Sequence, residues 1–173
     1  MPAFLLGYGG STGRPGLQAM VDDVAAVLNA IDVPDSRLIL FGRSLGSIAA
    51  IRGIRLRPRA SGLVIDSGIF DVLERVTLRV TPDELGVDAS ELADTIAREL
   101  DPVQPLASFR GRSLILHTRH DDLVDVTHAE RLFESSPEPK RLVIFDRGDH
   151  NSILEENRVE YVRALEELIA RAT

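Results

Sequence analysis

Short apolar runs alternate with amphipathic stretches along most of the chain. None of these runs alternates between apolar and polar residues, which is typical of parallel strands whose two faces are both covered. The pattern predicts about five strands, at residues 3–6, 38–41, 63–65, 114–116 and 142–145.

Stretches with helical periodicity lie between the predicted strands and after the last one. Apolar residues three or four positions apart from Leu17 to Ile31 predict a helix with one apolar stripe, and the same spacing recurs from Leu154 to Ile169. Because strand and helix alternate, the sequence predicts an α/β fold: a mostly parallel sheet with helices on both faces and right-handed crossovers.

Residues 67–110 interrupt this alternation. They contain two predicted helices, at about 71–80 and 89–100, and no clear strand. We therefore expect a single domain over residues 1–173, in which residues 67–110 form a helical insertion over the carboxyl edge of the sheet.

Composition and charge narrow the classes of function. Of the 173 residues, 44% are hydrophobic and 27% are charged, which fits a globular domain with a substantial core. The formal charge of -7 argues against binding to nucleic acid or to an anionic membrane. The apolar run at the start is short and follows no basic residues, so we expect neither a signal peptide nor a membrane span, but a cytoplasmic protein that acts on a small molecule.

The sequence contains no cysteine. Disulfides, thiolate metal ligands and a thiol nucleophile are therefore excluded together, and any nucleophile must be a hydroxyl or an amine.

A nucleophile motif stands between a predicted strand and a helical pattern, at Gly42, Arg43, Ser44, Leu45 and Gly46. A serine on a sharp turn from strand to helix needs neighbours without side chains, so that its hydroxyl stands clear of the sheet. The Leu45 N–H at the start of the helix then points to the place where an oxyanion would form. The motif predicts Ser44 as a nucleophile.

Candidate partners for this serine follow the later strands. Asp121 and Asp122 come after the run at 114–116, and His150 follows the run at 142–145. The carboxyl ends of parallel strands meet at one edge of a sheet, so His150 is expected to act there as the general base and one of the carboxylates as its orienting acid. Asp66 follows the third run and is a further candidate for the acid.

These motifs resemble the alpha/beta-hydrolase superfamily, and the resemblance spans nearly the whole chain. Residues 8–15 (YGGSTGRP) look like the family's Tyr-Gly-x-Ser-x-Gly loop, and residues 33–37 resemble its lead into the nucleophile strand. In the family the acid falls four residues after a histidine, which is Asp121 here, with Asp122 as the alternative. Thr118 replaces the usual glycine of that segment, and Asp125 replaces the usual proline.

The resemblance is closest to the small bacterial esterase, serine aminopeptidase-like and dienelactone hydrolase-like branches. It implies an esterase-type serine hydrolase that cleaves an ester, thioester or amide through an acyl-enzyme. Ser44, Asp121 and His150 would form the catalytic triad, and no cofactor would be needed.

One family feature is absent from the sequence. Family members normally carry three strands before the tyrosine loop, and the loop after the third donates a second oxyanion N–H from a His-Gly segment. No such segment precedes Tyr8. We therefore expect a truncated sheet with an exposed edge that favours self-association. We also expect the reaction to be slower by ~10²–10³-fold, because one donor of the oxyanion site is missing. A catalytically silent binding module is the alternative to an enzyme.

Other patterns carry weaker signals of binding. The loop from Gly7 to Gly16 lacks the spacing and the lysine of a phosphate loop. Four arginines between residues 52 and 59 are expected to form a solvated face, and His128 is expected at the surface. No metal site is predicted because no helical pair of ligands four residues apart supports one, although potential ligands gather at His117, His120, Asp121, Asp122 and His128.

Overall fold

The computed structural model describes residue 12 and residues 17–172. They contain a parallel sheet of four strands in the order β1-β2-β3-β4. Four of the five predicted strands are therefore present, and the fifth, at residues 3–6, lies outside the described residues. The strands are β1 (Ile39–Arg43), β2 (Gly62–Asp66), β3 (Arg112–Thr118) and β4 (Lys140–Phe145).

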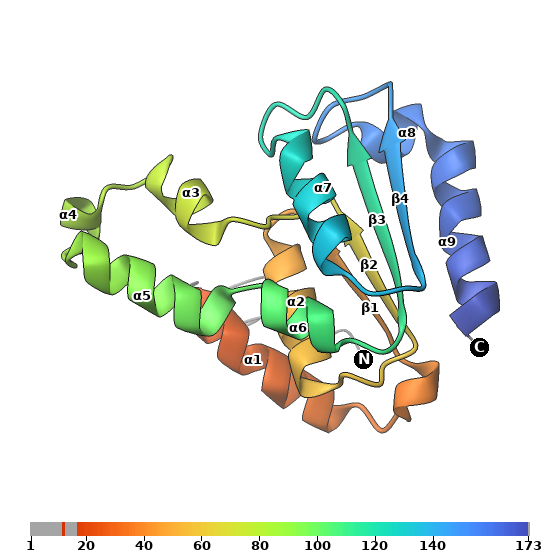
Figure 1. Cartoon of the computed structure of the whole chain (residues 1–173), viewed down its shortest axis with the longest axis horizontal. Coiled ribbons are helices and arrows are strands. Elements are labelled where there is room, and N and C mark those ends of the chain that lie inside the picture. The colour runs from red at the N-terminus through yellow and green to blue at the C-terminus, as the bar shows by residue number, and fades with distance from the viewer. Residues whose placement is uncertain (1–11, 13–16, 173) are drawn as a thin grey trace.

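Helices cover both faces of the sheet (Figure 1). None of the helices in this part of the chain has the length and apolar character needed to cross a bilayer. One face carries α1 (Leu17–Ala30), α2 (Gly46–Leu56), α6 (Val103–Ser108) and α7 (Val126–Ser135), and the other carries α8 (Ile153–Glu156) and α9 (Arg158–Ala172). A short 3-10 helix, η1 (Asp35–Arg37), precedes β1.

The two central strands are buried because helices lie over both of their faces. Leu63 and Ile65 of β2 pack with the first helical layer, whereas Val64 between them packs with α9. Each of these side chains is at most 2% exposed. This two-sided burial explains why the predicted runs of the two central strands, at 63–65 and 114–116, are apolar without alternation. β1 is an outer strand of the described sheet, and self-association through an exposed edge stays a prediction.

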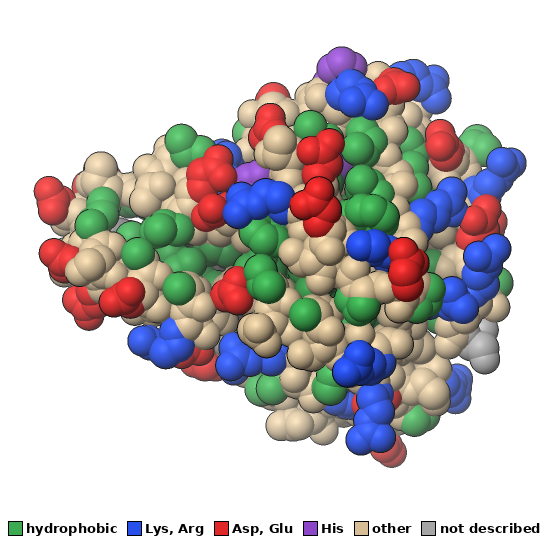
Figure 2. Space-filling view, in the orientation of Figure 1, with side chains coloured by type: hydrophobic (Ala, Val, Ile, Leu, Met, Phe, Trp, Pro, Cys, Tyr) green, Lys and Arg blue, Asp and Glu red, His purple; other side chains and the backbone are tan. Residues whose placement is uncertain are grey.

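The segment between β2 and β3 forms four helices, of which three project to one side of the sheet (Figure 1). The predicted helices at 71–80 and 89–100 correspond to α3 (Val72–Thr77) and α5 (Ala89–Leu100), with the short α4 (Pro82–Leu85) between them. Figure 2 shows acidic side chains gathered over these projecting helices. Their role as a cover over an active site stays a prediction.

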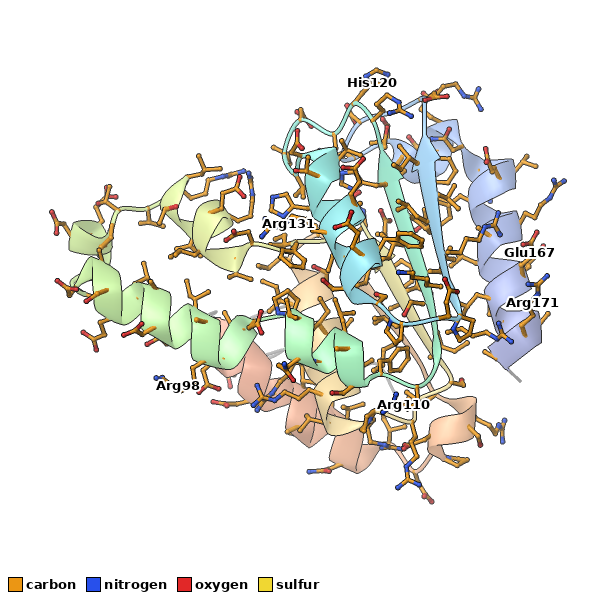
Figure 3. All side chains as sticks on the ribbon, in the orientation of Figure 1. Arg98, Arg110, His120, Arg131, Glu167 and Arg171 are labelled. Carbon is orange, nitrogen blue, oxygen red and sulfur yellow. The ribbon has the colours of Figure 1, made fainter. Side chains whose placement is uncertain are left out.

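Helix α7 holds the base of the projecting segment. His128 is 2% exposed, so its predicted place at the surface is wrong, and its Nδ1 accepts the backbone N–H groups of Phe70 at 3.0 Å and Asp71 at 3.3 Å. Arg131, labelled in Figure 3, lies 4.1 Å from the centre of the Phe70 ring and 3.6 Å from the Asp71 carboxylate. The chain leaving β2 is therefore tied to α7 by four contacts.

This anchor predicts a pH-dependent stability. Burial lowers the pKa of His128, although the Glu74 carboxylate opposes the effect. The unfolded chain consequently binds the proton more readily, so stability is fully present above the ordinary histidine pKa of about 6.5 and falls as the pH drops below it. We expect His128→Asn, which keeps an acceptor near the Nδ1 position, to show a smaller fall in unfolding free energy between pH 7.5 and pH 5.5.

Urea unfolding of both proteins at the two pH values measures this difference. The other two buried histidines, His117 and His150, are present in both proteins, so any contribution that they make to the pH dependence cancels in the comparison. An equal fall in the wild type and in His128→Asn would contradict the anchor.

Candidate active site

The parallel sheet brings the candidate residues to one edge. Ser44 follows β1, Asp66 ends β2, Asp121 follows β3 and His150 follows β4. This edge lies at the upper ends of β3 and β4 in Figure 1. Segments that are more than 100 residues apart in the sequence therefore meet because all four strands run in the same direction.

Ser44 has a φ of 51°, in the left-handed region that few residues other than glycine adopt. Gly42 makes the turn possible, because a Cβ there would lie 2.4 Å from the Gly46 carbonyl oxygen and 2.7 Å from the Ala50 Cβ. Gly46 has no heavy atom of the described residues within 4 Å of such a Cβ, so crowding explains only the first of the two glycines. The Ser44 N–H donates to the Asp66 carbonyl at 2.9 Å and closes the turn onto β2.

A continuous chain of hydrogen bonds joins the serine, the histidine and an aspartate. Ser44 Oγ lies 2.9 Å from His150 Nε2, and His150 Nδ1 lies 2.8 Å from Asp121 Oδ2. Asp121 Oδ1 accepts the backbone N–H groups of Leu123 at 2.9 Å and Val124 at 2.7 Å. The imidazole is 4% exposed and the carboxylate is fully buried. The structure thus brings together the three residues that the sequence suggested as a triad.

The two alternative acids do not occupy this place. Asp122 is exposed. Asp66 is 1% exposed, but its carboxylate accepts the Tyr161 hydroxyl at 2.8 Å and the Ser67 hydroxyl at 3.0 Å. In the described part of the chain, His150 Nδ1 is hydrogen-bonded to the Asp121 carboxylate and to neither alternative.

Two turns shape the loop that carries the histidine. Gly148 has a φ of 79°, and the Thr118 hydroxyl donates to its carbonyl at 2.7 Å. One residue later, the Asp149 carboxylate accepts the Ser152 hydroxyl and backbone N–H, and these bonds hold the pKa of Asp149 below its usual value. Thr118, where the family has glycine, therefore ties the end of β3 to the His150 loop. The sequence shows the replacement of glycine by Thr118 but gives no sign of this contact.

The loop that carries the acid is also fixed from both sides. His117 is fully buried, its Nε2 lies 3.0 Å from the Val124 carbonyl, and burial lowers its pKa, so the neutral ring donates this bond. Asp125, which replaces the family's proline, is the N-cap of α7 and accepts the Thr127 N–H at 2.9 Å. Asp125 thus supplies a helix cap where the family's proline would give a rigid turn.

Helix α2 begins beside the serine hydroxyl. Leu45 precedes its first residue and is 43% exposed. The first N–H groups of a helix have no partner within the helix and carry its positive dipole end, so this end can donate to a developing oxyanion.

The potential metal ligands do not converge. His117 lies beneath the acid loop, His128 lies against the base of the projecting segment, and His120 points outward from the top of the molecule (Figure 3). Within residues 17–172, no group of three or more histidine, aspartate or glutamate side chains could hold a metal ion.

Comparisons with known sequences relate the chain to alpha/beta hydrolases. No protein-family model matches the sequence. The uncharacterized protein YfhR of Escherichia coli O157:H7 is 27% identical over 150 residues, which cover 83% of this chain. Alpha/beta hydrolase domain-containing protein 17C of Xenopus tropicalis is 25% identical over 168 residues, which cover 95% of it. The chain spans about half the length of these curated relatives, since each match covers 50% of the relative.

Solved structures show the same fold. An esterase from Thermogutta terrifontis superposes with a TM-score of 0.68 at 19% identity, over 97% of this chain and 78% of that one. A monoacylglycerol lipase from Paleococcus ferrophilus gives 0.66 at 20% identity, over 94% and 78% of the two chains. The sequence matches and the arrangement of strands and helices together show that the chain has an alpha/beta-hydrolase fold and is similar to members of that superfamily.

Proposed function

We propose that this chain is a serine hydrolase that cleaves an ester, thioester or amide bond through an acyl-enzyme. The observation that carries the proposal is the unbroken hydrogen-bond chain from Ser44 through His150 to Asp121. A hydroxyl becomes an effective nucleophile when an adjacent base can take its proton and a third group orients that base. The three side chains meet this requirement with distances of 2.8 and 2.9 Å.

In the first half of the reaction, Ser44 Oγ attacks the carbonyl carbon of the substrate, and His150 Nε2 takes the hydroxyl proton. Asp121 accepts the Nδ1–H bond, which holds the ring in the tautomer that leaves Nε2 free and stabilises the imidazolium. The Leu45 N–H donates to the oxyanion of the tetrahedral intermediate. His150 then gives its proton to the departing alcohol, thiol or amine, and the acyl group stays on Ser44.

Hydrolysis of the acyl-enzyme repeats these steps with water. His150 takes a proton from the attacking water molecule, the second tetrahedral intermediate forms, and its collapse returns the proton to Ser44 Oγ as the carboxylic acid leaves. Each step uses only side chains and backbone groups of this chain. The proposed reaction therefore needs no organic cofactor or metal ion.

Carboxylic esters are the first substrates to test. The two solved structures described above are an esterase and a lipase, and an ester has a better leaving group than an amide. A series of p-nitrophenyl esters of increasing acyl length, with matched thioesters and anilides, separates the three bond types.

The proposed nucleophile can be tested directly. A fluorophosphonate probe should label the wild-type chain covalently, and Ser44→Ala should abolish both labelling and ester hydrolysis, with a loss of about 10⁴-fold or more in kcat. Gel fluorescence and steady-state kinetics measure the two effects, and circular dichroism checks folding. A folded wild-type chain that neither reacts with the probe nor hydrolyses any ester would contradict the proposal and favour a silent binding module.

Two neighbouring carboxylates, Asp121 and Asp122, form a matched pair that tests the proposed acid. Asp121→Asn should lower kcat by roughly 10⁴-fold, because the amide favours the wrong histidine tautomer. Asp122→Asn makes the same chemical change one residue later on an exposed side chain, and kcat should stay within about threefold of the wild type, as expected for a surface substitution. Steady-state kinetics with one ester measures kcat for both variants. Similar losses in the two variants would remove Asp121 from its assigned role.

A further inference from the structure

The arginine that precedes the nucleophile bridges two parts of the active site. Arg43 Nη2 donates to the backbone carbonyl of His150, and Arg43 Nε lies 3.5 Å from Asp66 Oδ2. The first contact joins residues 107 positions apart and ends on the residue whose imidazole must reach Ser44. The guanidinium therefore links the end of β2 to the loop that follows β4.

Asp66 holds this guanidinium from the protein interior. A buried carboxylate is costly unless donors and a counter-charge surround it. Asp66 accepts the Tyr161 hydroxyl on Oδ2 and the Ser67 hydroxyl on Oδ1, and the Arg43 guanidinium forms an ion pair with it. Tyr161 is 3% exposed and its ring stacks on Phe145 of β4, which fixes the hydroxyl in place. Burial, aided by the Asp66 charge, raises the pKa of Tyr161, so the hydroxyl remains a donor.

The position of the His150 backbone matters for the chemistry. The imidazole makes bonds of 2.9 Å to Ser44 and 2.8 Å to Asp121 at the same time, so its loop has little freedom to move. Thr118 holds the loop at the Gly148 carbonyl, and Arg43 holds it two residues later at His150 itself. A displacement of about 1 Å at a reacting group can cost about 10²-fold in rate.

We propose that Arg43 is a positioning residue that holds the backbone of His150 beside the nucleophile, with Asp66 and Tyr161 fixing its guanidinium. The inference rests on the proposed hydrolase function, because it assigns Arg43 a role in that reaction. A planar guanidinium suits this position, because its N–H groups point in two directions and can reach both the His150 carbonyl and the Asp66 carboxylate. A lysine ammonium is a compact point charge. The competing explanation is that Arg43 and Asp66 form an ion pair that only stabilises the fold.

A charge-balanced variant separates the two explanations. Arg43→Met alone leaves the buried Asp66 carboxylate without its cation and should lower both Tm and kcat. In Arg43→Met/Asp66→Asn the uncompensated charge is gone, and the new amide oxygen can still accept the Tyr161 hydroxyl. We expect the double variant to recover most of the lost Tm while its kcat stays about 10- to 100-fold below the wild type, with KM changed less than threefold.

Two further variants complete the set. Arg43→Lys keeps a cation beside Asp66 without the planar guanidinium, so it should fold normally and still lose about tenfold in kcat. Arg119→Met is the matched control, because it removes an exposed arginine that contacts Asp146 at 3.0 Å near the same edge of the sheet. Its kcat should equal that of the wild type. Wild-type kcat in both the double variant and Arg43→Lys would overturn the positioning role and leave a structural ion pair.

A spectroscopic measurement keeps this test separate from the test of the hydrolase function. The proton between His150 Nδ1 and Asp121 gives a strongly downfield ¹H resonance when the imidazole is held against the carboxylate. We expect this resonance in the wild type and in Arg119→Met, and its loss or broadening in Arg43→Met/Asp66→Asn. If the wild type hydrolyses nothing, the hydrolase proposal fails, and this resonance alone decides the positioning: an unchanged signal in the double variant overturns it, and a lost signal supports it.

Discussion

The hydrogen bond between Ser44 and His150 joins two residues that are 106 positions apart in the sequence, and much of the fold serves to make it. It requires Ser44 to adopt a left-handed backbone conformation, which Gly42 permits by leaving room for the Gly46 carbonyl and the Ala50 side chain. It also requires β1 and β4, at opposite sides of the described sheet, to run in the same direction, so that their carboxyl ends share an edge. The buried strands β2 and β3 hold these two strands at a fixed separation.

The loops that carry the histidine and the acid are stabilised by polar side chains that lie behind them and do not touch the reacting atoms. His117 fixes the carbonyl of Val124, whose N–H in turn holds Asp121. Thr118 fixes the turn at Gly148, just before His150. Each of these contacts acts on the backbone and not on a reacting atom. They explain how a site built on loops can keep its reacting side chains within hydrogen-bonding distance of one another.

The sequence was sufficient to predict the regular strands and helices that alternate along the chain. Apolar runs predicted the four described strands, and burial on both faces accounts for those of the two central strands, β2 and β3. Helical spacing predicted α1, α5 and α9 to within a few residues. The Gly-x-Ser-x-Gly motif, with glycines at 42 and 46 around Ser44, identified the nucleophile turn, because a sharp backbone bend requires specific residues. Chain order and strand ends were then enough to choose the histidine.

Contacts between distant side chains could not be predicted in the same way. Tyr161 looked like one apolar residue in a helical stripe, and only the packing of α9 on β4 brings its hydroxyl to Asp66. His128 looked like a surface residue, because nothing in its own helix indicates that the chain after β2 folds back over it. Periodicity reports which face of an element is apolar, whereas these contacts depend on which element lies opposite.

The most direct test of the account is the chemical identity of the reaction intermediate. Turnover of a slowly hydrolysed ester can be quenched with acid, and the chain can then be digested and examined by tandem mass spectrometry. The account predicts an acyl group on the Ser44 side chain, in the peptide that contains the strand-to-helix turn. An acyl group on any other side chain would contradict it.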